Sequence, residues 1–169
     1  MLNSKVEQVL IAQIDKEGYS SNLYLAMASW AENKGLKGIA DWLYAQADEE
    51  RLHMLKFVKY VNERGGQAVI SAVAEPPKDF KSVKVMFNEV LKHEEMITAS
   101  INNIVGVCLD QKDFTTQNYM QWFVTEQIEE EASVRGIIDK LNLVGETNLY
   151  LFDRDIMSLR GTGATAKAQ

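Results

Sequence analysis

Apolar residues recur at helical spacing through most of this chain, so the pattern predicts a protein built from long α-helices. We expect a first helix over residues 4–33, which Asn3 or Ser4 caps and Lys34-Gly35 ends. A second helix should run from about Lys37 to Arg64. Because only a short turn joins these two helices, they should pack antiparallel as a hairpin.

Residues 66–81 carry no strong helical period and contain both prolines of the chain, Pro76 and Pro77. They are therefore expected to form a long connection along the surface. Such a connection allows a third helix, from about Ser82 to Leu109, to run parallel to the second.

A fourth helix is expected from Thr115 to about Asn142, and a short fifth helix from about Glu146 to Leu159, after the break at Gly145. The predicted fold class is all-α: a four-helix bundle with a long crossover between helices 2 and 3 and a short C-terminal helix. We expect one domain over residues 1–160 and a disordered tail over residues 161–169.

The inner face of each long helix is apolar except near its middle, where polar side chains interrupt it. Helices of similar length that pack side by side bring their midpoints to one level. The interrupting residues should therefore meet in one polar layer between apolar layers. They are Glu17, Glu50, His53, Glu94, Gln127 and Glu130.

The carboxylates of this layer cannot all remain ionised without cations, because like charges a few ångströms apart repel strongly. Two divalent cations would neutralise the four glutamates, with the histidine uncharged. Oxygen ligands with one imidazole suit iron or manganese, and zinc less selectively. The arrangement is that of the di-iron carboxylate bundles, except that the fourth helix offers Gln127-x-x-Glu130 in place of Glu-x-x-His. Taken alone, Glu50 and His53 are more simply interpreted as a hydrogen-bonded pair on a half-exposed helix face.

Composition narrows the function classes. The chain has 169 residues, 46% of them hydrophobic, and a net charge of −6, which argues against a nucleic-acid partner. The single Cys108 excludes an intrachain disulfide framework and fits a reducing cytosol. We find no secretory signal, and no apolar run approaches the roughly 18 residues of a membrane span. A cytoplasmic protein without a membrane partner is expected.

Four segments together give the chain a specific resemblance to the bacterial non-haem ferritins. They are Glu17 with Ser20-Ser21-Asn22-Leu23-Tyr24, the stretch Asp48-Glu49-Glu50-Arg51-Leu52-His53, the pair His93-Glu94, and WFVTEQIEEE from Trp122 to Glu131. The resemblance covers about residues 1–160. It implies a ferritin-like homo-oligomeric cage of twenty-four subunits that oxidises Fe(II) with O2 or peroxide and stores Fe(III) mineral.

The resemblance also implies roles for particular residues. A first iron would bind Glu17, Glu50 and His53, and a second would bind Glu94 and Glu130, with Glu50 as the bridge. Gln127 would lie beside the second iron, Tyr24 would hydrogen-bond to the site, and Trp122 would pack nearby. A third iron site would use Glu49, Glu126 and Glu129, and it could share Glu130 with the second. From the residues alone, these three glutamates are most simply a solvated acidic face.

Three alternatives stay open. Bacterioferritins resemble a more symmetric version with Glu-x-x-His on two helices; since the second motif is absent here and Arg51 follows Glu50, no haem is expected. A di-iron peroxidase or oxygenase without mineral storage is the second, although one cysteine cannot supply the Cys-x-x-Cys domain of a rubrerythrin. The third is a plain structural bundle, against which the mid-helix carboxylates argue. His93 points about 100° away from Glu94 and is not expected in the site.

Overall fold

The computed structural model describes residues 2–160, apart from the side chain of Glu146, and the tail predicted for residues 161–169 lies outside them. Within the described residues all regular secondary structure is helical. Four long α-helices are followed by a short one that is flanked by 3-10 turns. These elements are α1 (Ser4–Asn33), α2 (Lys37–Glu63), α3 (Val83–Asp110), α4 (Phe114–Val144), η1 (Glu146–Asn148), α5 (Leu149–Asp155) and η2 (Ile156–Leu159).

The predicted helix ends agree closely with the structure. The Asn3 side chain accepts a hydrogen bond from the backbone of Lys5, and Ser82 caps α3 in the same way. Gly35 follows α1 with φ of 77°, a left-handed conformation that glycine adopts without strain. The fifth helix is shorter than predicted, because regular α-helix is confined to Leu149–Asp155.

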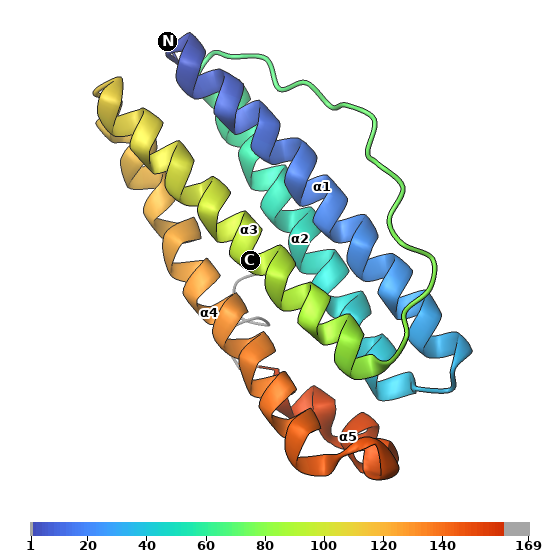
Figure 1. Cartoon of the computed structure of the whole chain (residues 1–169). Coiled ribbons are helices and arrows are strands. Elements are labelled where there is room, and N and C mark those ends of the chain that lie inside the picture. Colours follow the sequence, from blue (N-terminus) through green and yellow to red (C-terminus); the bar gives the residue numbers. More distant parts are fainter. Residues whose placement is uncertain (1, 161–169) are drawn as a thin grey trace.

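Figure 1 shows α1 and α2 as an antiparallel hairpin beside a second hairpin of α3 and α4. The crossover after α2 runs the length of the bundle, so α2 and α3 point the same way, as predicted. At its end Asp79 accepts a hydrogen bond from the Trp30 indole at 2.7 Å. The short α5 lies across one end of the bundle and contacts α2 and α4. No helix among residues 2–160 is long and apolar enough to cross a membrane.

Two separate apolar clusters form the core. One lies toward the end of the bundle that α5 covers and includes Trp42 and Phe87; the other lies toward the opposite end and includes Phe57 and Phe123. The stacked rings of Phe57 and Phe123 have centroids 4.2 Å apart. The polar mid-helix residues belong to neither cluster, so the structure has the predicted order of apolar, polar and apolar layers.

Candidate metal centre

Four helices contribute buried acidic or imidazole side chains to the polar layer. Glu17 comes from α1, Glu50 and His53 from α2, Glu94 from α3 and Glu130 from α4, and each is at most 6% exposed. Side chains this polar are buried at a high cost in free energy unless a partner or a cation compensates them. The layer is therefore the candidate functional site of the protein.

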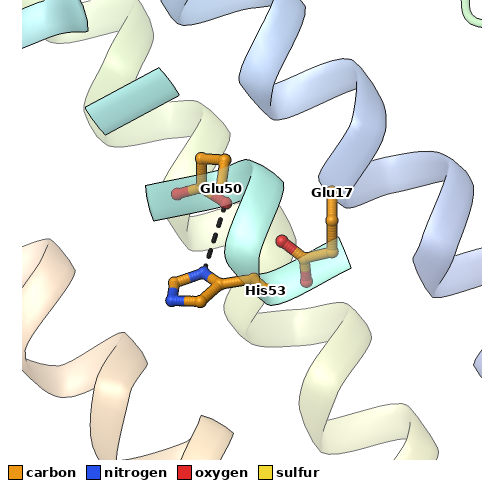
Figure 2. Close-up of side chains that lie close together, drawn as sticks. All are labelled: Glu17, Glu50 and His53. Atoms are coloured by element: carbon orange, nitrogen blue, oxygen red, sulfur yellow. Dashed lines mark ion pairs between the residues drawn. The ribbon is translucent and has the colours of Figure 1, made fainter. Parts of the chain in front are cut away.

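The closest grouping joins α1 to α2. Ligand atoms of Glu17, Glu50 and His53 all lie within 4.8 Å of one another, and Figure 2 shows these three side chains converging. His53 Nδ1 is 3.4 Å from Glu50 Oε2. Glu17 Oε2 is buried and has no hydrogen-bond partner within the described part of the chain. An orphaned carboxylate oxygen aimed among other ligands fits a metal site.

Glu94 and Glu130 lie on the α3 and α4 side of the layer. Tyr24 donates a hydrogen bond to Glu94 Oε1 at 2.5 Å, and Gln127 Nε2 lies 3.3 Å from Glu94 Oε2. Gln46 donates to Glu130 Oε2 at 2.9 Å. Tyr24 and Gln127 therefore both lie within hydrogen-bonding distance of the Glu94 carboxylate.

Burial and mutual repulsion raise the pKa values of the clustered carboxyl groups. Burial raises the pKa of Glu17 well above its usual range, and the charge of Glu50 adds to this. Burial and the charge of Glu94 do the same to Glu50 and to Glu130. Burial also raises the pKa of Glu94, although hydrogen bonds from Tyr24 and Gln127 act in the opposite direction. The raised pKa values favour the protonated form of these carboxyl groups, whereas a bound divalent cation would favour the ionised form.

A second grouping shares His53. Its ligand atoms and those of Glu49 and Glu126 lie within 4.8 Å of one another. Glu126 is only 4% exposed, so it is not part of a solvated face, whereas Glu129 is exposed and outside both groupings found among residues 2–160. Glu49 Oε2 also forms an ion pair with Arg160 Nη2 at 2.9 Å.

Two aromatic rings of α4 pack against the imidazole of His53. The ring of Trp122 meets that of His53 edge-on at 5.4 Å, and Phe123 does so at 6.2 Å. Trp122 also lies under the Lys56 ammonium at 4.2 Å. These contacts agree with the expectation that Trp122 packs near the site.

His93 lies outside the centre. Its Nε2 is 2.7 Å from the Ser20 hydroxyl, and its ring tilts against that of Tyr19. Burial lowers the pKa of His93 to about 4, so the imidazole is neutral near pH 7. His93 belongs to neither grouping of possible metal ligands found among residues 2–160.

Several residues without a predicted role contact the site: Gln13, Gln46 and Thr98 form hydrogen bonds with layer residues, and Arg160 pairs with Glu49 of the second grouping. Gln13 and Gln46 were visible as polar residues on inner helix faces, one turn before Glu17 and Glu50, but received no role. Arg160 gave no signal at all, because its pairing with Glu49 depends on how the end of the chain folds back.

The fold and this site define a class of protein: a helical bundle with a buried layer of carboxylates and imidazole suited to metal ions. A family profile described as the ferritin-like domain matches residues 7–144. The chain therefore belongs to the ferritin-like family, and the predicted fold and resemblance are confirmed.

Individual relatives span nearly the whole chain. A probable bacterial non-heme ferritin-like protein of Haemophilus influenzae is 43% identical over 161 residues, which cover 94% of this chain and 98% of the relative. A bacterial non-heme ferritin of Campylobacter jejuni is also 43% identical and covers 94% and 96%. Among solved structures, an open-pore ferritin of Archaeoglobus fulgidus has a TM-score of 0.91 and 41% identity, covering 95% and 98%.

Proposed function

We propose that this protein is an iron-storage ferritin that oxidises Fe(II) at a centre within each subunit and stores Fe(III) as mineral in a cage. The observation that carries the proposal is the convergence of Glu17, Glu50 and His53, with one Glu17 oxygen left for a ligand. The kinship with bacterial non-heme ferritins supports the same conclusion.

In this proposal two iron ions bind as substrates in unlike sites. The first takes Glu17, Glu50 and His53; the second takes Glu94 and Glu130, with Glu50 between them and Gln127 and Tyr24 alongside. Each Fe(II) gives up one electron. Two electrons and two protons convert O2 to hydrogen peroxide, and the same number converts peroxide to water.

The difference between the two sites explains how iron would leave. Only the first site has an imidazole ligand, and on the α4 side the chain has Glu130 where a symmetric centre would have histidine. The second site lacks the imidazole ligand that suits divalent iron, so it would be the weaker of the two sites for Fe(II). We infer that Fe(III) moves from the second site to the mineral.

A third iron site with Glu49, Glu126 and Glu129 is also proposed. The grouping of Glu49, His53 and Glu126 supports two of these ligands. Because Glu49 Oε2 is paired with Arg160, the guanidinium would compete with an ion for this carboxylate.

The remaining parts of the proposal concern assembly and context. Residues 1–160 act as one domain, and twenty-four copies form the cage without haem in the cytoplasm. The apolar face of α5 and its flanking turns, with Phe152 and Ile156 buried against the bundle, closes one end of each subunit.

One experiment tests the function directly. Metal-free protein receives excess Fe(II) in air and is separated by size exclusion, with iron and protein both measured in the eluate. Iron far beyond two ions per chain, eluting with a very large particle, is expected. About two ions per chain on a small species would indicate a di-iron enzyme without storage, and no retained iron would refute the metal centre.

A further inference from the structure

Two buried glutamines contact the metal layer without belonging to the ligand set. Gln13 on α1 is fully buried, and Gln46 on α2 is 3% exposed. A buried primary amide has two donors and an acceptor to satisfy, so its contacts reveal what it holds in place. Each of these two amides donates to a different ligand carboxylate.

Gln13 is the last donor in a series of hydrogen bonds that runs from Lys16 toward the metal layer. Lys16 Nζ donates to Ser100 Oγ at 2.6 Å, and Ser100 donates to Gln13 Oε1 at 2.6 Å. Gln13 Nε2 then donates to Glu17 Oε1 at 2.7 Å. Because Ser100 holds the carbonyl end of the amide, the NH2 end is fixed toward Glu17.

This arrangement separates the two oxygens of Glu17. Oε1 is occupied by Gln13, whereas Oε2 is the buried oxygen that has no partner among residues 2–160. The carboxylate is therefore turned to offer one defined oxygen to an ion. Hydrogen bonds in such a series polarise one another, which strengthens the last one.

Gln46 does the equivalent on the other side of the layer. Its Nε2 donates to Glu130 Oε2 at 2.9 Å, reaching from α2 to α4 across the bundle. The residue type matters in both cases. A lysine would donate equally well but would repel the incoming cation, and a glutamate would add another charge to the cluster.

We propose that Gln13 and Gln46 are positioning residues, each acting on one iron site: Gln13 through Glu17 on the first, and Gln46 through Glu130 on the second. The inference rests on the ligand assignment of the proposed function. Partners that orient metal ligands typically change metal affinity by roughly 10–100-fold when they are removed. Replacing either glutamine should therefore lower the metal affinity of its own site by roughly 10–100-fold and leave the affinity of the other site unchanged.

The test uses Co(II), which occupies iron sites, resists oxidation under these conditions and reports its ligands through its visible absorption. Gln13→Met and Gln46→Met keep the side-chain length and remove the donor. Each is titrated in the full-length protein in two backgrounds: Glu130→Ala, which leaves the first site, and Glu17→Ala, which leaves the second. Gln121→Met is the matched control, because Gln121 is exposed on α4 and its side chain donates to the backbone of Gln117 rather than to a ligand of the layer.

Each glutamine substitution is expected to affect one metal site and to spare the other. Gln13→Met should weaken Co(II) binding and shift the spectrum only where the first site remains, and Gln46→Met only where the second remains. Equal losses at both sites would indicate a general structural defect and overturn the proposal, as would binding equal to the Gln121→Met control. If the protein that retains both glutamines does not bind Co(II) at either site, the proposed metal pair itself is refuted.

A second variant keeps the test decisive if Gln13→Met does not fold. Ser100→Ala changes a half-buried residue and retains Gln13, but releases the carbonyl end of its amide. It should weaken the first site by a smaller factor than Gln13→Met and spare the second. An unchanged first site in Ser100→Ala would overturn the proposed role of this hydrogen-bond chain.

Discussion

Replacing Glu17 by glutamine should change how the stability of the metal-free protein depends on pH. The Glu17 carboxyl is 1% exposed, and burial together with the charge of Glu50 raises its pKa in the folded state. In the unfolded chain its pKa is about 4.3. Between these two values the folded protein holds a proton that the unfolded chain has released.

The direction in which stability changes with pH follows from this difference in pKa. Below about pH 4 both states are protonated, so the stabilising contribution is fully present. As pH rises toward the folded pKa, the contribution is lost, and the free energy of unfolding falls by about 1.4 kcal/mol per pH unit for one retained proton. Glu17→Gln removes at most that one proton. Its free energy of unfolding should therefore fall less steeply, by up to about 1.4 kcal/mol per pH unit.

Urea unfolding of chelator-treated protein, followed by circular dichroism at pH 5, 6 and 7, measures both slopes. His93 has the opposite effect, because burial lowers its pKa to about 4, but it is present in both proteins and cancels in the comparison. Parallel slopes would refute the reasoning, since they would mean that Glu17 is ionised in the folded metal-free protein. Bound Co(II) should abolish the contribution of Glu17 to the slope of the unvaried protein, because the ion binds the deprotonated carboxylate. At a hundred times its Kd, the ion should also stabilise that protein by about 2.7 kcal/mol.

Three further outcomes are expected. Combining Gln127→Glu with Glu130→His should slow iron turnover, because a nitrogen ligand would retain iron in the second site. Stopped-flow oxidation followed by a second addition of Fe(II) measures this turnover, and an unchanged rate would contradict the prediction. Arg160→Gln removes the cation paired with Glu49, so a third Co(II) should bind more tightly by calorimetry, and equal affinity would show that the ion pair does not compete. Phe57→Ala empties a fully buried position and should lower the free energy of unfolding by about 3–5 kcal/mol in urea; a loss below about 1 kcal/mol would mean that the core collapses around the gap.

The helices and the layer were readable from the sequence because both depend on local periodicity. The spacing of apolar residues fixes which face of a helix is buried, whatever it packs against. Glu17, Glu50, Glu94 and Glu130 could be assigned to one depth for the same reason, and all four are buried in the structure. The residues that end helices, such as Gly35, act through their own backbone conformation and were equally visible.

The fifth helix shows where local reasoning weakens. The apolar spacing over residues 146–159 predicted one continuous helix, but the structure interrupts it with 3-10 turns at both ends. A segment this short has little helical stability of its own, so packing against α2 and α4 decides its conformation.

The contacts between helices were decided by the tertiary structure alone. Gln46 reaches Glu130, and Arg160 reaches Glu49, across 84 and 111 positions of the chain. Glu126 is buried while Glu129 remains exposed, although both lie in the same acidic run. Periodicity gives the direction of a side chain around its own helix axis. The partner it meets depends on how the neighbouring helix is rotated and shifted along its axis, and only the packing of the whole bundle sets those two quantities.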